Sequence, residues 1–345
     1  MGFFIYMIVV SLFNGMNTGR QALENVGIKV DKYYSSELKP YAIKLTQYHF
    51  PDTIQVGDVT KWREWNIDWS KVNIILSGSP CQDLSNAGKK AGIYGNKSSL
   101  FFVFIDILNH CKSLNPNVLF LQENVGSANK LDVGIMSREM GLYPCRINSS
   151  LVVAALRDRY YWTNIRTKQS MFDVVTDIPE PKDRNVYLKD IIEYGFVNQE
   201  KSSCLMQGWS RPNNENEYKK ILKRHDKKFL TVVFKDEQTY LRVKEATKIG
   251  FIDVAENECV DLSYPTSKTR RGRLMKDKSN CLLRNNEYFV FTDKSLRIFN
   301  KTELCRLQGF PDNYCDILTR NEAASLLGDG WTLPIIEHIF SYINK

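Results

Sequence analysis

Two motifs place side chains suited to chemistry on a heterocyclic base. Cys81 follows Pro80 directly after the apolar run VNIILS. A thiol at the carboxyl end of a strand points into the ligand crevice and can act as a nucleophile. Glu123 follows the next apolar run, LFLQ, where a carboxyl group can protonate or hydrogen-bond a ring nitrogen of a bound base. A lone cysteine is usually inert packing, so the position after proline is what makes Cys81 a candidate.

A pair of arginines adds a second kind of group. Arg157 and Arg159 precede the aromatic run YYW, which predicts another strand. Residues two apart share one face of a strand, so we expect the pair to hold a base oxygen and to orient the catalytic groups. A surface salt-bridge pair is the alternative.

A further set of residues predicts a cofactor site. The stretch SLFNGMNTG (11–19) is a glycine-bearing turn between a strand and a helix, without the GxGxxG spacing of a dinucleotide site. Glu37 follows the second strand, where a carboxylate can bind both hydroxyls of a ribose, and Asp58 is placed to bind an adenine amino group. Taken singly, each acid is more typical of a solvent-facing cap. Together they predict a phosphate-free, adenosine-type cofactor.

The elements that must position these groups follow an α/β pattern up to about residue 165. Short apolar runs alternate with helix-like stretches, which predicts a doubly wound sheet with parallel strands. Ligands of such sheets bind beyond the carboxyl ends of the strands, where these motifs fall. We expect strands at 5–12, 32–36, 72–77 and 118–122, and helices at 19–26, 40–49 and 100–112.

The alternation fades after about residue 168. Two basic clusters, 219–228 and 268–278, each carry six Lys or Arg against one Asp. The first is as typical of a solvated face as of a binding surface. The second contains Gly272 among Arg270, Arg271 and Arg273, which favours a loop that grips phosphates. Helices are expected again at 296–307, 320–327 and 335–343.

Composition limits the class of protein. The 345 residues predict about two domains, and the net charge of +8 is compatible with a polyanionic partner. The eight cysteines include no CxxC pair and no Cys/His cluster, so we expect no metal and no disulfide framework. The apolar N-terminal run of about 13 residues is too short to span a bilayer, which needs about 20. We expect a soluble protein with no membrane partner.

In their order, these motifs resemble those of the DNA (cytosine-5) methyltransferase family. The resemblance covers residues 8–165 and 296–343, and SLFNGMNTG and SGSPCQDLSN are most similar to the catalytic domains of the animal de novo enzymes. The matching motifs are the turn at 11–19, Glu37, Asp58, Pro80-Cys81-Gln82, Glu123-Asn124-Val125, Arg157-x-Arg159, RLQGFP (306–311) and GDGW (328–331).

The resemblance implies a Rossmann-like methyltransferase sheet with a smaller, irregular target-recognition domain. Residues 1–168 would form the catalytic and cofactor-binding domain, residues 169–295 the target-recognition domain, and residues 296–345 would return to complete the catalytic domain. The implied S-adenosyl-L-methionine site consists of Phe13, Asn14, Gly15, Met16, Asn17, Thr18, Gly19, Glu37, Asp58, Val59, Pro80, Leu100, Asp329, Gly330 and Trp331.

The family mechanism, carried over to this sequence, implies catalysis by Cys81, Glu123, Arg157 and Arg159. Cys81 would attack C6 of a cytosine flipped out of double-stranded DNA, while Glu123 binds N3 and Arg159 binds O2. Arg270, Arg271 and Arg273 are the candidates for DNA contact. A cognate restriction endonuclease is a candidate partner, and the cytoplasm of a bacterial or phage-infected cell is the expected location.

Three other hypotheses stay open. Transfer RNA is the substrate of one branch of the family, but that branch has a Pro-Pro-Cys-Gln-Pro motif and a Cys-Phe-Thr element, neither of which occurs here. A non-catalytic regulatory protein on the same scaffold typically loses the Pro-Cys or the cofactor turn, and this chain keeps both. A Rossmann-type dehydrogenase lacks support because the first turn has the wrong glycine spacing.

Overall fold

The chain forms two compact units. The computed structural model describes residues 6–80, 93–95, 99–193, 240–255, 258–262, 264, 266–269, 271–275, 288–292 and 295–343. The first unit comprises Met1–Asn148, Asp158–Pro181 and Trp331–Lys345, and the second comprises Ser149–Arg157 and Lys182–Gly330. This division differs from the expected one, because residues 296–330 group with the second unit and only the last 15 residues return to the first.

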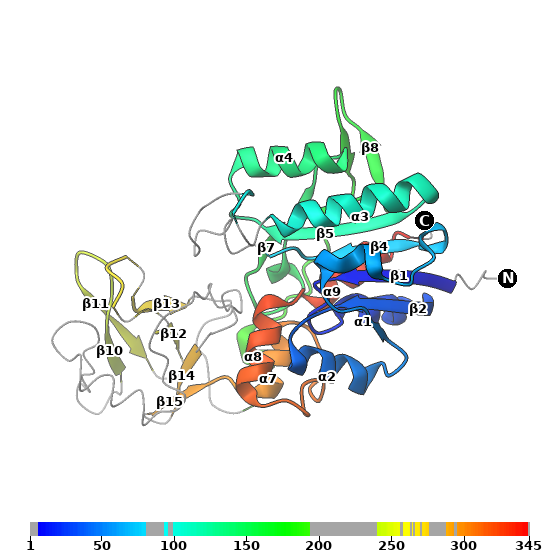
Figure 1. The fold of residues 1–345 in the computed structure, drawn as a ribbon. Helices are drawn as coiled ribbons and strands as arrows, with labels where there is room; N and C mark the ends of the chain where they lie inside the picture. Colours follow the sequence, from blue (N-terminus) through cyan, green and yellow to red (C-terminus); the bar gives the residue numbers. More distant parts are fainter. Residues whose placement is uncertain are drawn as a thin grey trace. The chain divides into compact units, whose positions relative to one another are not determined.

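The first unit is built on a seven-stranded sheet with the order β3-β2-β1-β4-β5-β7-β6 (Figure 1). Strands β1 to β5 pair in parallel, whereas β7 is antiparallel to both β5 and β6. The doubly wound class is therefore confirmed, but the expectation of parallel strands is wrong for β7. The strands are β1 (Tyr6–Leu12), β2 (Lys29–Ser36), β3 (Ile54–Gln55), β4 (Ile74–Ser77), β5 (Leu119–Val125), β6 (Cys145–Asn148) and β7 (Asp158–Thr163).

Helices pack on both faces of this sheet. Successive strand residues point to opposite sides, so apolar side chains of one strand contact helices on both faces. Ile75 lies in the apolar cluster around α3, while a side chain on Gly19 of α1 would collide with the neighbouring Leu76. The helices of the unit are α1 (Thr18–Asn25), α2 (Pro40–His49), α3 (Leu100–Leu114), α4 (Lys130–Met140) and α9 (Leu333–Phe340), with short 3₁₀ helices η1 (Val59–Glu64) and η2 (Trp69–Lys71) and a hairpin of β8 (Thr167–Gln169) and β9 (Val174–Thr176).

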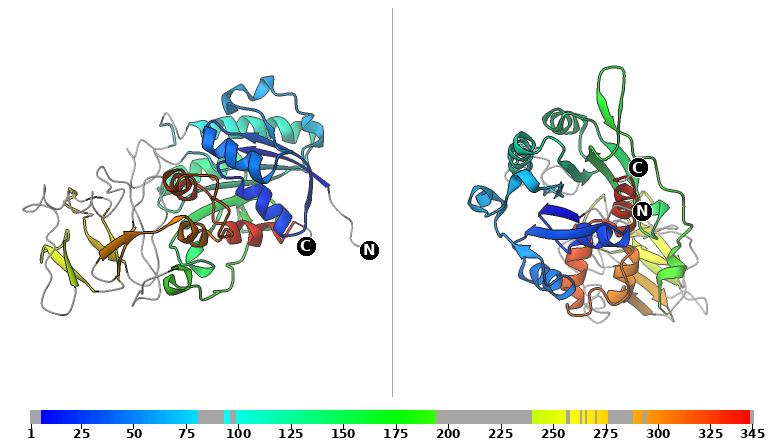
Figure 2. Two further views of the ribbon diagram at one scale, coloured as in Figure 1. Left: turned by 90° about the horizontal axis from the view of Figure 1, so that it is seen from below. Right: turned by 90° about the vertical axis from the view of Figure 1, so that its right-hand side faces the viewer.

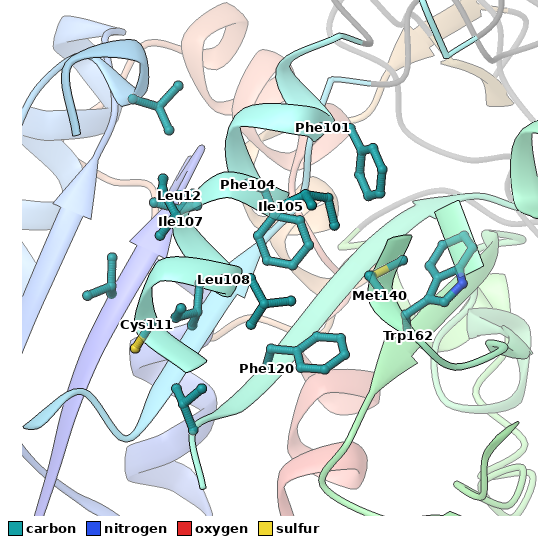
Figure 3. Packing of buried hydrophobic residues seen from close by; sticks show 14 of the residues in the cluster. Leu12, Phe101, Phe104, Ile105, Ile107, Leu108, Cys111, Phe120, Met140 and Trp162 are labelled. Carbon is teal, nitrogen blue, oxygen red and sulfur yellow. The ribbon is translucent and has the colours of Figure 1, made fainter. Parts of the chain in front are cut away.

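The main core lies between α3 and one face of the sheet (Figure 3). Apolar residues three or four apart along α3 form a continuous buried stripe that faces the strands. Phe104 of this stripe packs against Phe120 of β5, and the Trp162 ring of β7 is fully buried in the same cluster. This packing fixes β5 and β7, the strands that carry Glu123 and Arg159.

The C-terminal helix α9 belongs to the first unit and lies beside α1 (Figure 2). Asn25, at the end of α1, donates a hydrogen bond to Glu337, and His338 is hydrogen-bonded to the carbonyl of Pro179. The last segment of the chain thus closes the unit that its first strand begins.

The described part of the second unit contains two antiparallel sheets and three α-helices. The sheets have the orders β10-β11 and β13-β12-β14-β15. The strands are β10 (Tyr240–Lys244), β11 (Phe251–Ala255), β12 (Cys259–Asp261), β13 (Arg273–Met275), β14 (Tyr288–Thr292) and β15 (Ser295–Ile298), and the helices are α5 (Leu188–Ile191), α7 (Lys301–Leu307), α8 (Arg320–Asp329) and the 3₁₀ helix η3 (Ser149–Leu151).

The helix expected at 296–307 is wrong in its first part. Residues 295–298 form β15 and pair with β14, and the helix begins only after Asn300. Asn300 accepts a hydrogen bond from the backbone of Glu303, whose carboxylate accepts one from the backbone of Asn300. This capping box is a strong helix start, and it separates the strand from the helix.

Candidate functional site

The turn after β1 is shaped by three residues with left-handed backbone. Phe13, Gly15 and Asn17 have φ angles of 56°, 60° and 65°. Such angles are uncommon for residues other than glycine, so the loop is held in a conformation that the sequence does not favour locally. Asn17 precedes α1 and is fully buried, and within the described part of the chain neither polar atom of its side chain has a hydrogen-bond partner. An amide buried in this way at a helix N-terminus suits a polar ligand.

The remaining residues of this turn are structural or buried. Asn14 accepts a hydrogen bond from the Tyr33 hydroxyl at 3.1 Å. Burial raises the pKa of Tyr33, which keeps the proton that this bond uses. Met16, Thr18 and Gly19 are buried where α1 meets the sheet.

The two predicted cofactor carboxylates both bind backbone amides. Glu37 accepts a hydrogen bond from the Gly15 amide at 2.7 Å, which ties the end of β2 to the turn after β1. Asp58 accepts bonds from the backbone and the hydroxyl of Thr60 at 2.9 and 2.8 Å, and these hold the pKa of Asp58 below its usual value. Each carboxylate oxygen can accept more than one hydrogen bond, so capping does not exclude ligand binding.

The apolar members of the predicted site lie close to the main core. Val59 is buried in that core, and Leu100, the first residue of α3, packs against it. Pro80 is half-buried beyond the end of β4. Cys81 itself lies outside the described residues. Strand β4, which precedes it in the sequence, is parallel to β5 and aligned so that Ser77 lies opposite Gln122.

Glu123 is the centre of the described polar contacts. It lies within β5, which runs on to Val125 and does not end at Gln122 as expected. One carboxylate oxygen lies 2.6 Å from Nε of Arg159, and the other accepts a hydrogen bond from the Trp331 indole at 3.1 Å. The Arg159 and Glu123 side chains are about nine-tenths buried. Charge-assisted contacts of this kind hold a carboxylate in one orientation.

The Trp331 indole also lies against Gly78. A Cβ atom on Gly78 would be only 2.8 Å from Nε1 of Trp331, so glycine alone fits there without displacing the ring. The contact between Trp331 and Glu123 joins residues 208 positions apart. Nothing in the sequence pattern pointed to it, because Trp331 was assigned only to the cofactor site.

Arg157 differs from the expectation that it shares a strand face with Arg159. β7 begins at Asp158, and Arg157 belongs to the second unit. There it is buried and donates hydrogen bonds to the carbonyls of Gly328 and Asp329 at 3.0 and 3.4 Å. A cation at the C-terminal end of a helix is favourable, so the guanidinium stabilises the end of α8 and the residues that lead to Gly330.

The candidate DNA-contact loop is folded onto the end of β10. Arg271 donates to the carbonyl of Glu245 at 3.2 Å, and the exposed Arg273 donates to that of Thr269 at the same distance. Gly272 between them has a φ of 61° and no room for a side chain. Arg270 lies outside the described residues.

Among the residues that the structure describes, no group of three or more His, Cys, Asp or Glu side chains is placed to hold a metal ion. In the same residues, none of the helices is long and apolar enough to cross a membrane.

The mixed sheet, with β7 inserted antiparallel next to β5, defines a Rossmann-like methyltransferase fold. Two solved structures share it: DNMT2 of Spodoptera frugiperda, with a TM-score of 0.54, 18% identity and coverage of 98% of this chain and 99% of that one, and the methyltransferase EhMeth of Entamoeba histolytica, with a TM-score of 0.54, 18% identity and 98% coverage of both chains.

Sequence comparison gives the family. The model for C-5 cytosine-specific DNA methylases matches residues 7–345, and the chain belongs to this family. Type II methyltransferase M1.ScrFI of Lactococcus lactis subsp. cremoris is 25% identical over 345 residues, which cover 96% of this chain and 76% of the relative. Orphan methyltransferase M.Rho11sI of Bacillus phage rho11s is 32% identical over 173 residues, which cover 46% of this chain and only 33% of the relative.

Proposed function

We propose that the protein transfers a methyl group from S-adenosyl-L-methionine to C5 of cytosine in double-stranded DNA. The observation that carries the proposal is the buried Glu123 carboxylate, oriented by Arg159 and Trp331 on the strand next to the one that leads to Pro80-Cys81. Family membership supports the same activity.

The residues of the first unit fit the methyl donor. The left-handed turn at residues 13–17, the buried amide of Asn17, and the carboxylate of Glu37 provide polar groups at the start of α1. Val59 and Leu100 provide apolar surface. Bound there, S-adenosyl-L-methionine would supply an electrophilic methyl group.

The chain's own residues would carry out the remaining steps on cytosine. Flipping the base out of the duplex costs a few kcal/mol. The Cys81 thiolate forms a bond to C6, which makes C5 nucleophilic, and Glu123 shares a proton with N3 while Arg159 binds O2. After methyl transfer a base removes the C5 proton, the C6–sulfur bond breaks, and the thiolate is regenerated.

We propose that the second unit binds the DNA. Arg270, Arg271 and Arg273 are assigned to phosphates, because the sequence places these three arginines around Gly272 in a basic cluster. Since M1.ScrFI is named a type II methyltransferase, a restriction endonuclease is the protein partner to look for.

The test is methyl transfer from labelled S-adenosyl-L-methionine to unmethylated duplex DNA, with transfer RNA as the second substrate. We expect label at C5 of cytosine in DNA. Cys81→Ser should abolish transfer and leave donor binding intact by calorimetry, whereas the matched variant Cys145→Ser, in β6, should remain active. Label in RNA alone, or normal turnover by Cys81→Ser, would contradict the proposal.

A further inference from the structure

The Ser79 hydroxyl is tied to two side chains of the neighbouring strand. It accepts a hydrogen bond from Nε2 of Gln122 at 2.9 Å and one from Nδ2 of Asn124 at 3.4 Å. All three residues are buried, with 4%, 0% and 1% of their surface exposed. Gln122 and Asn124 flank Glu123 along β5, so the segment after β4 is attached directly to the strand that carries the carboxylate.

Gln122 is a rigid anchor for this attachment. Its backbone lies between β4 and β7, opposite Ser77 on one side and Trp162 on the other. The Nε2 atom also donates to the carbonyl of Glu123 at 2.9 Å, which fixes the orientation of the amide. The side chain therefore has little freedom to follow Ser79 if that segment moves.

The Gln122 amide is not optimised for stability. Among the residues that the structure describes, its buried Oε1 atom has no hydrogen-bond partner. A buried polar atom without a partner costs about 1–3 kcal/mol, and an apolar side chain of similar size would avoid that cost. A residue that destabilises the core in this way while holding Ser79 points to a role in function.

The segment after β4 also has a contact on the other face of β5. Side chains alternate along a strand, so Glu123 points away from Gln122 and Asn124. On the Glu123 side, the Trp331 indole lies against Gly78. Immediately before Pro80, Gly78 is thus held by the Trp331 indole and Ser79 by two side chains of β5.

We propose that Gln122 is a positioning residue for the nucleophile and acts through Ser79. Cys81 follows Ser79 by two residues, a reach of at most about 7 Å, so fixing Ser79 restricts where the chain can place the thiol relative to Glu123. This inference rests on the proposed function, in which Cys81 attacks the base while Glu123 binds it.

The test uses Gln122→Met, which keeps the volume but cannot donate, with Ser79→Ala and the double variant. Gln47→Met is the matched control, because Gln47, in helix α2, also donates to a backbone carbonyl, that of Thr53 at 2.8 Å. Two measurements are made on the full chain: steady-state methyl transfer, and hydrogen exchange of the amides of Gly78 and Ser79.

In Gln122→Met and Ser79→Ala we expect kcat to fall about tenfold, because a 1 Å misplacement of reacting groups can cost up to about 100-fold. The KM values for DNA and for the methyl donor should stay within about twofold. Exchange should accelerate at Gly78 and Ser79 only. The double variant should be no slower than the slower single variant, because Ser79→Ala already removes the hydrogen bond that Gln122→Met breaks. Gln47→Met should match the wild type.

Three results would overturn the inference: unchanged exchange at Gly78 and Ser79, a kcat within twofold of the wild type, or independent effects that multiply in the double variant. If the wild type itself transfers no methyl group, the proposed function fails. Hydrogen exchange at Gly78 and Ser79 then tests by itself whether Gln122 fixes the segment after β4. The two failures are therefore distinguishable.

Discussion

Gly78→Ala is expected to break the contact between Trp331 and Glu123. The added Cβ would lie 2.8 Å from Nε1 of Trp331 and 3.3 Å from Cε2, where ordinary carbon contacts are about 3.5–4.0 Å. The indole must therefore move by about 0.7–1 Å. Its hydrogen bond to Glu123 is 3.1 Å long, so a shift of this size takes it beyond hydrogen-bonding distance.

The magnitude follows from three contributions. Overpacking costs about 1–3 kcal/mol, and losing a hydrogen bond to a charged group costs about 1.5–3 kcal/mol. Replacing glycine also lowers the conformational entropy of the unfolded chain, which stabilises the variant by about 0.4–1 kcal/mol. We expect the free energy of unfolding to fall by about 2–5 kcal/mol and kcat to fall at least tenfold.

Urea unfolding followed by circular dichroism, together with methyl transfer at a temperature where the variant is folded, measures both effects. Gly134→Ala in α4 is the matched control, because a Cβ there meets no atom within 4 Å. It should be as active as the wild type and slightly more stable, since alanine favours a helix. If the free energy of unfolding of Gly78→Ala is within about 0.5 kcal/mol of the wild-type value, the Trp331 indole is not confined against Gly78.

Three further predictions concern other parts of the chain. Glu123→Gln should lower kcat at least 100-fold while calorimetry shows unchanged binding of the methyl donor; a loss below tenfold would remove Glu123 from the chemistry. Gly272→Ala should lower the free energy of unfolding in urea by about 2–4 kcal/mol, because a Cβ there would collide with the Lys244 carbonyl oxygen at a φ that alanine rarely adopts. Unchanged stability would contradict this loop geometry. Burial raises the pKa of Cys111 to about 11 and that of Cys145 to about 12. At pH 8 both groups stay protonated, so peptide mapping after iodoacetamide treatment should find them far less modified than an unstructured cysteine, and equal modification would show that burial does not protect them.

Local signals in the sequence were sufficient for much of the first unit. α2 has the predicted bounds, since its proline at the first helical position marks the start and the apolar pattern marks the length. The order of strands and helices up to β5 was likewise predicted from apolar runs that alternate with helix-like stretches. Glu37 directly follows β2, as predicted, because the strand ends at Ser36.

Contacts between distant segments could not be predicted. Residues 296–298 were predicted as the start of a helix, but pairing with β14 makes them part of a strand. The separation of Arg157 from Arg159 depends on where β7 begins and on the carbonyls at the end of α8, neither of which leaves a local signal. The partners of Ser79 and Glu123 likewise come from other strands and from the end of the chain.

The return of the last residues to the first unit determines when the protein can become active. Trp331 contacts a residue 208 positions earlier, and the bond between Asn25 and Glu337 spans 312 positions. Such contacts cost chain entropy before they stabilise the fold, and they cannot form until both segments have been made. During synthesis, the ribosome makes all of Lys182–Gly330 before it adds the indole that orients Glu123. A nascent chain released before residue 331 would have the carboxylate without its partner, and would reach the DNA without the means to modify it.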